Sequence, residues 1–140
     1  MINPQDVIDA LMGIRNSESF PDSSQDLTAK WVSAGGDVST VEAILRFMED
    51  NPSIDYGIPG PLVHYVETFY GNGYEDLLIE SVKRNPTTHT IWMLNRVING
   101  TKNIPRRQLL IETMMQAAKH PAIDKVTVER IKHFVSRLTE

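Results

Sequence analysis

Three prolines recur at a nearly constant interval, each directly after a charged segment with apolar residues at helical spacing. They are Pro52, Pro86 and Pro121, so the intervals are 34 and 35 residues. A period in the thirties is typical of stacked two-helix repeats, because one helix–turn–helix layer uses about that length. Proline disfavours helical geometry in the residue before it and therefore marks the end of a unit. The spacing predicts a repeat-like stack of helical hairpins, an architecture that commonly binds other proteins.

Apolar residues follow the helical period along nearly the whole chain, and no run alternates as a half-buried strand would. Val41, Ile44, Leu45 and Met48 form one such apolar face. About eight segments of this kind are joined by short turns. The predicted fold is therefore all-α, with about eight antiparallel helices arranged as HEAT-like hairpins. The length of 140 residues and the 41% hydrophobic content fit a single helical domain over residues 1–140.

Helix boundaries follow from capping and punctuating residues. Asn3 followed by Pro4 predicts the start of the first helix. The second helix is expected at residues 24–33, after a polar loop, and residues 39–42 are interpreted as a capping box for the third. The later helices are expected to begin at Pro61, Tyr74, Thr87 or Thr88, Pro105 and Asp124.

Short turns place consecutive helices side by side, so three antiparallel pairs are expected. The break over residues 51–60 is the longest and the richest in turn residues, yet it is too short for a domain linker. The expected pairs are residues 24–33 with 39–49, residues 61–70 with 74–84, and residues 88–99 with 105–119.

Composition excludes several classes of protein. The absence of cysteine excludes a disulfide framework, a thiolate zinc site and a catalytic thiol. The first residues lack a basic segment followed by an apolar run, so no signal peptide is expected. No run of apolar residues is long enough to predict a membrane span. Together these features predict a cytoplasmic protein without membrane contact.

The formal net charge is −4, from 14 lysines and arginines against 18 aspartates and glutamates. Sequence-independent binding of DNA or RNA needs a concentrated basic face, so no direct binding of nucleic acid is expected. A basic protein partner fits the charge better. The ordinary mild acidity of cytoplasmic proteins explains it equally well.

Residues that could carry catalysis are sparse. His64 with Glu67, and Glu129 with His133, are spaced as helix neighbours. A metal-binding bundle would need more carboxylates and a second matching pair. The segment from Gly57 to Pro61 has prolines where a phosphate-binding loop needs donor amides. We therefore expect no metal site, no cofactor and no enzymatic activity.

Tyrosines and charged residues crowd into two dozen positions that span a loop and two helix ends. Tyrosine beside carboxylates is typical of protein interfaces, because it offers apolar area and a hydroxyl at low entropic cost. About half of these tyrosines are equally well explained as core residues with satisfied hydroxyls. The predicted partner-binding residues are Asp55, Tyr56, His64, Glu67, Tyr70, Tyr74, Glu75 and Asp76.

Within this set we assign different roles to the aromatic and the acidic residues. Tyr56 and Tyr74 are the expected anchors, which hold a complex once it has formed. The carboxylates are expected to steer a basic partner toward the surface, since rim charges act chiefly on the association rate. They are Asp55, Glu67, Glu75 and Asp76.

The stretch from Tyr56 to Glu67, Tyr-Gly-Ile-Pro-Gly-Pro-Leu-Val-His-Tyr-Val-Glu, resembles a motif of small helical immunity proteins. These proteins accompany bacterial contact-dependent growth inhibition and related polymorphic toxin systems. The likeness extends through residues 90–96 and 119–121, touches most of residues 50–125, and leaves the first fifty residues uncovered. It assigns no subfamily, and no oligomeric state follows from it.

The resemblance implies tight, specific binding to a cognate toxin domain in the cytoplasm, so that the toxin's active site or substrate surface is covered. Many such toxins are nucleases with basic substrate clefts, which an acidic chain would complement. The alternative is a general helical-repeat adaptor with no toxin partner.

Overall fold

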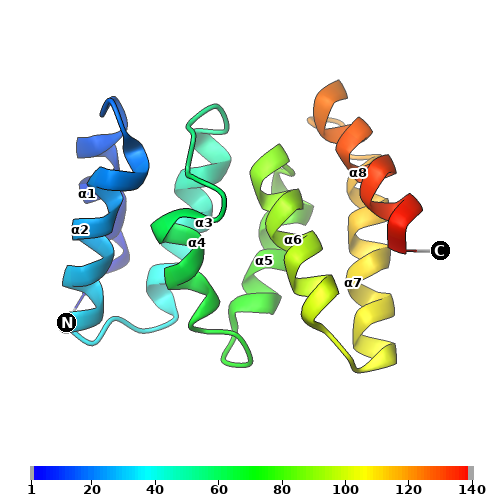
Figure 1. Cartoon of the computed structure of the whole chain (residues 1–140), viewed down its shortest axis with the longest axis horizontal. Coiled ribbons are helices and arrows are strands. Elements are labelled where there is room, and N and C mark those ends of the chain that lie inside the picture. Colours follow the sequence, from blue (N-terminus) through cyan, green and yellow to red (C-terminus); the bar gives the residue numbers. More distant parts are fainter. Residues whose placement is uncertain (1, 139–140) are drawn as a thin grey trace. The chain divides into compact units, whose positions relative to one another are not determined.

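The computed structural model describes residues 2–138, and over that range it contains eight α-helices and no β-strand (Figure 1). The all-α prediction is confirmed. The chain divides into two compact units between Leu77 and Leu78, within the fifth helix; the expectation of a single domain stays a prediction. The helices are α1 (Pro4–Ile14), α2 (Phe20–Ser33), α3 (Ser39–Asp50), α4 (Gly60–Glu67), α5 (Tyr74–Arg84), α6 (Thr88–Gly100), α7 (Ile104–Ala117) and α8 (Lys125–Leu138).

The first unit is a two-layer arrangement of helical hairpins. Helix α1 packs on α3, α2 packs on α4, and α1 also contacts α2 (Figure 1). Trp31 of α2 meets Tyr65 of α4 edge to face, with ring centroids 5.6 Å apart. The predicted pairing of residues 24–33 with 39–49 is wrong, because α2 makes its main contacts with α4 and α1 instead of α3.

The core of the first unit lies between these layers. Leu11, Ile44 and Leu62 are completely buried in it. The hydroxyl groups of Thr40 and Tyr65 lie 2.7 Å apart and link α3 to α4 by a buried hydrogen bond. Burial raises the pKa of Tyr65, so this hydroxyl stays protonated.

The second unit packs α6 against both α7 and α8, and α8 runs back along α7 (Figure 1). The predicted pair of residues 88–99 with 105–119 is confirmed. Leu94, Met114 and Ile131 contribute buried apolar side chains from the three helices. The hydroxyls of Thr88 and Thr127 lie 2.8 Å apart and join the start of α6 to the start of α8.

Several predicted caps are confirmed. The Asn3 side chain accepts a hydrogen bond from the backbone N–H of Gln5, and Pro4 occupies the first turn of α1. Thr87 caps α6 in a reciprocal box with Thr90. Each cap satisfies backbone donors that have no partner within the helix.

Helices α4, α7 and α8 begin one residue from the predicted starts, and the starts of α2 and α3 differ from the prediction in their caps. Helix α2 begins at Phe20, because Ser19 caps it and Pro21 fits the first turn. Ser39 lies inside α3, so the predicted capping box is wrong. The Asp37 carboxylate instead accepts hydrogen bonds from the Ser39 hydroxyl and backbone N–H, and these bonds hold the pKa of Asp37 below its usual value.

The third predicted pair, residues 61–70 with 74–84, assumed a longer helix than is found. Helix α4 ends at Glu67, and residues 68–73 form turns that contain Gly71 and Gly73 with positive φ. That pairing stays a prediction. None of the helices within residues 2–138 is long and apolar enough to cross a membrane.

The loop before α4 needs glycine at two positions. Gly57 has φ +94° and Gly60 has φ +80°, values that side-chain-bearing residues rarely adopt. A Cβ on Gly57 would lie 2.8 Å from the Gly60 Cα, whereas a Cβ on Gly60 would meet nothing within 4 Å. The loop therefore folds back on itself at Gly57.

We expect Gly57→Ala to lower the free energy of unfolding by more than about 2 kcal/mol, because it adds a backbone clash to an unfavourable φ. Gly60→Ala carries the conformational penalty alone and should lose about 1 kcal/mol. Urea unfolding of both variants measures the difference. Equal losses would show that the backbone contact at Gly57 does not limit substitution.

Candidate interaction site

All eight predicted partner-binding residues lie in the first unit, between the α3–α4 loop and the first turn of α5. Their exposure separates them into three groups. Asp55, His64, Tyr70 and Asp76 are exposed, Glu67 and Glu75 are half-buried, and Tyr56 and Tyr74 are buried.

Tyr56 belongs to the core, so its prediction as an interface anchor is wrong for this structure. Its side chain is 1% exposed and lies edge-on to Phe20 and Phe47, at ring-centroid distances of 5.2 and 6.4 Å. Its hydroxyl donates to the carbonyl oxygen of Asn51 at 2.7 Å. Burial raises the pKa of this phenol above its ordinary value. Tyr56 therefore fastens the α3–α4 loop to the helices beneath it.

Tyr74 is also a core residue, with an exposure of 0%. It begins α5, where we expected an exposed anchor. Tyr70 keeps 40% of its surface exposed and is the one predicted tyrosine of the described chain that remains accessible to a partner. The aromatic part of the predicted site is thus reduced to Tyr70.

The acidic residues divide between surface and local structure. Both carboxylate oxygens of Glu75 accept from the backbone N–H of Gly71 at 3.0 Å, so this side chain stabilises the turn before α5. Asp55 accepts from the N–H of Gly57 at 2.9 Å while remaining exposed. Asp55 and Asp76 are the two exposed members of the predicted steering group.

Sequence reasoning missed Ile58 as a surface residue. Its side chain is 86% exposed, the highest value among the exposed large hydrophobic residues. It follows Gly57 and is joined to Pro59 by a cis peptide bond, on the loop that Tyr56 holds in place. One feature of the sequence indicates this exposure: Ile58 is an apolar residue flanked by glycines and prolines. In such a segment, helical periodicity does not determine which side chains are buried.

The α3–α4 loop (residues 51–59), which we call the Ile58 loop, borders a groove of about 350 Å³ at one end of the first unit. The α1–α2 loop and the α3–α4 loop meet there, at the top of Figure 1. The Pro21 Cγ would lie 3.4 Å from a Cβ on Gly57, so the first turn of α2 is in close contact with the α3–α4 loop. The groove is lined by Arg15, Ser17, Glu18, Ser19, Phe20, Pro21, Ser53, Ile54 and Asp55.

His64 borders a different hollow, of about 530 Å³, between α2 and α4. Val32, which is 65% exposed, lines the α2 side, and Tyr65 and Thr68 line the α4 side. The Thr68 hydroxyl donates to the carbonyl of Tyr65 at 2.6 Å, within its own chain segment. His64 therefore borders a different hollow from the one that Asp55 lines, and neither hollow contains all the predicted residues.

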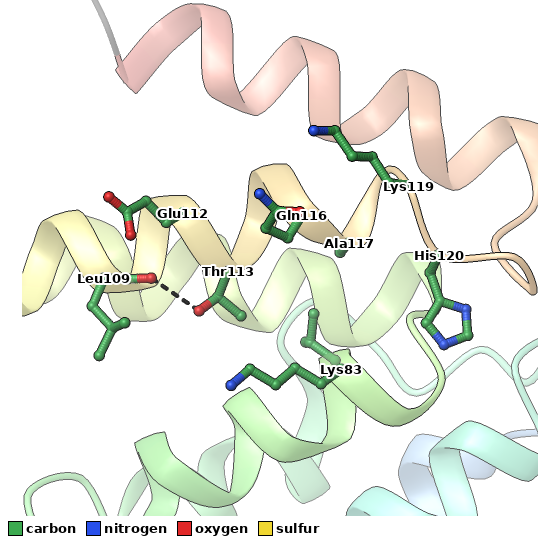
Figure 2. A pocket seen from close by; sticks show the side chains of 9 residues that line it. Lys83, Leu109, Glu112, Thr113, Gln116, Ala117, Lys119 and His120 are labelled. Atoms are coloured by element: carbon green, nitrogen blue, oxygen red, sulfur yellow. Dashed lines mark hydrogen bonds between the residues drawn. The ribbon is translucent and has the colours of Figure 1, made fainter.

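A groove of about 450 Å³ lies in the second unit, along α7 (Figure 2). Its Thr113 hydroxyl donates to the carbonyl of Leu109 at 2.9 Å. The side chains of Lys83 and Lys119 lie on opposite sides of α7 in this view. The lining residues therefore show neither a nucleophile beside a base nor converging cations.

No three His, Asp or Glu side chains gather in a metal-binding arrangement within residues 2–138. The Nδ1 atom of His120 accepts from the N–H of Ala122 at 3.0 Å, a local bond at the end of α7. His133 is exposed on α8.

Charge is divided unequally between the two units. The first unit has 13 acidic and three basic residues, a net charge of −10. The second has five acidic and 11 basic residues, a net charge of +6. The whole-chain value of −4 is their sum and describes neither unit. The Ile58 loop and its groove lie in the strongly acidic one.

Comparison with known proteins leaves the chain without an assigned relative: no family model, no curated protein and no solved structure matches it.

Proposed function

We propose that the chain is an immunity protein, which binds the toxin domain of a contact-dependent growth inhibition or related polymorphic toxin system in the cytoplasm. In this proposal the toxin domain is a basic nuclease, and binding covers its active site. The observation that carries the proposal is an exposed isoleucine on a fastened loop of a strongly acidic helical unit.

The loop has the properties of a preorganised contact surface. Tyr56 anchors it through two ring contacts and one hydrogen bond, and Gly57 packs against Gly60. A loop that is already ordered loses little conformational freedom when it binds, so more of the contact energy appears as affinity. Ile58 at its tip offers apolar area to a pocket of the partner.

The charge near the loop favours a basic partner. Glu18 and Asp55 line the groove beside it, and Asp50 ends α3 just before the loop. Arg15 is the cation of the groove. Carboxylates around an apolar contact would steer a basic nuclease domain into place and disfavour acidic competitors.

Co-expression tests the proposal against a general adaptor function. The toxin candidate is the last few hundred residues encoded by a large effector gene directly upstream, where such a gene exists. We expect the two chains to co-purify as a stoichiometric complex that survives size-exclusion chromatography. Absence of a complex with that domain, together with capture of unrelated partners, would favour the adaptor.

A further inference from the structure

The second unit concentrates its exposed positive charge on α8. Within the described part of this unit, seven exposed side chains are cationic and four are acidic. Four of the seven cations lie on α8, which holds one of the four acids, Glu129. The α8 cations are Lys125, Arg130, Lys132 and Arg137.

These cations form two exposed stripes along the helix. Thr127 and Ile131 are buried on the packed side of α8, in the unit where α8 contacts α6 and α7. Lys125 and Lys132 are seven residues apart, as are Arg130 and Arg137, so the members of each stripe are separated by nearly two turns, about 10 Å. The two stripes lie about 140° apart around the helix, and Glu129 lies between them. We call the exposed side formed by Lys125, Arg130, Lys132 and Arg137 the basic face of α8.

Other side chains on this side do not cancel the positive charge. Glu129 lies 3.5 Å from the Lys132 Nζ, and both side chains are more than 60% exposed. An exposed pair of this kind contributes little stabilisation and can exchange partners readily. His133 and Val126 complete a shallow hollow of about 440 Å³ with Lys125, Glu129 and Arg130. The basic face therefore keeps a net charge of +3 at neutral pH, with a hollow along it.

We propose that the basic face of α8 binds the phosphate backbone of nucleic acid. The 14 residues of α8 span about 21 Å, the length of about six phosphates along one strand of duplex DNA. Lysine and arginine contacts to phosphate release condensed counterions, which supplies affinity without sequence recognition. The imidazole of His133 is the exposed ring on this helix, and no Phe, Tyr or Trp of the described residues of α8 is exposed, so the face fits contact with the phosphate backbone better than stacking on bases.

The net charge of the whole chain does not exclude nucleic acid binding by this unit. The whole chain has a net charge of −4, whereas the unit that contains α8 has a net charge of +6. The inference goes beyond the proposed immunity function and stands independently of it, because it concerns a different unit and can be tested without a toxin.

The test uses the full chain with a short labelled DNA duplex and a short labelled single-stranded RNA. The variant combines Lys125→Gln, Arg130→Gln, Lys132→Gln and Arg137→Gln, which retain good helix propensity. The matched control combines Arg15→Gln, Lys30→Gln and Arg46→Gln, the three cations of the first unit. The two variants have net charges of −8 and −7, so they differ mainly in where charge was removed.

Fluorescence anisotropy between about 50 and 200 mM salt should show salt-dependent binding by the wild-type chain. In the α8 variant we expect a loss of about tenfold or more in affinity for duplex DNA, with a salt slope reduced by about three to four. The control should bind as the wild type does. Circular dichroism should show both variants folded.

Three results would overturn the proposal. Wild-type chain that binds neither probe at the lowest salt would do so, as would equal losses in the α8 variant and the control. The third is self-association that disappears in the α8 variant while nucleic acid binding is absent, seen by analytical ultracentrifugation. That result would show that the basic face of α8 binds the acidic unit of a second copy of the chain.

Discussion

Replacement of Tyr56 by alanine is expected to lower the free energy of unfolding by about 3–5 kcal/mol, the range for truncating a large buried aromatic side chain. The substitution would leave a cavity between Phe20 and Phe47 and remove the hydrogen bond to the Asn51 carbonyl. Urea unfolding, followed by far-ultraviolet circular dichroism, measures the loss.

Two further variants separate the contribution of the Tyr56 ring from that of its hydroxyl and compare a buried tyrosine with an exposed one. Tyr56→Phe keeps the ring and removes the hydroxyl, so it should lose only about 1–2 kcal/mol. Tyr70→Ala alters a tyrosine that is 40% exposed and should change stability much less than Tyr56→Ala. If Tyr56→Ala left the melting temperature unchanged but weakened partner binding, Tyr56 would be an interface residue after all.

Replacement of Ile58 by aspartate should have the opposite profile, with a large effect on binding and almost none on folding. Under the proposed function, Ile58→Asp places a charge where an apolar contact is buried. We expect a loss of about 2 kcal/mol or more, which is a factor of about 30 in Kd for the toxin domain. Isothermal titration calorimetry measures the affinity, and thermal unfolding measures the stability.

The chain provides a matched control in Ile104, which is 72% exposed at the start of α7 in the second unit. Ile104→Asp makes the same chemical change far from the Ile58 loop in the sequence, and it should leave the affinity unchanged. If both variants bound the toxin domain as tightly as the wild type, the contact surface would lie elsewhere on the chain.

The all-α fold was predictable because helical periodicity is a local property of the sequence. Asn3 and Thr87 act as caps for the reason that the sequence indicates: each side chain can reach a backbone donor in the first turn of its helix. Ser39 fits the same capping pattern, yet it lies inside its helix. The Asp37 carboxylate, two residues earlier, accepts the hydrogen bonds from the Ser39 hydroxyl and backbone N–H. Local patterns therefore predict helices better than they predict the residue at which each begins.

The candidate site was harder to predict, because exposure in a loop depends on tertiary contacts. Tyr56 and Ile58 are two residues apart, yet one is buried and the other is 86% exposed. No periodic rule applies between Asn51 and Gly60, so the sequence could not rank the two side chains. Tyr56 is buried because it contacts Phe20, and this contact joins residues that are 36 positions apart in the sequence.

The charge distribution was also hidden in the sequence total. A net charge of −4 suggested a mildly acidic surface, whereas the boundary at Leu77 and Leu78 separates −10 from +6. The boundary falls inside α5, where composition gives no linker signal. Only the fold shows which charges belong together.

Under the proposed function, this chain neutralises a toxin domain by covering its active site. The most direct measurement is the nuclease activity of the upstream-encoded toxin domain, titrated with the purified chain. We expect cleavage to fall linearly to zero at one chain per toxin domain. Ile58→Asp should shift the titration to higher concentration, whereas Ile104→Asp should not. Undiminished cleavage at a large excess of the folded wild-type chain would contradict the proposed function.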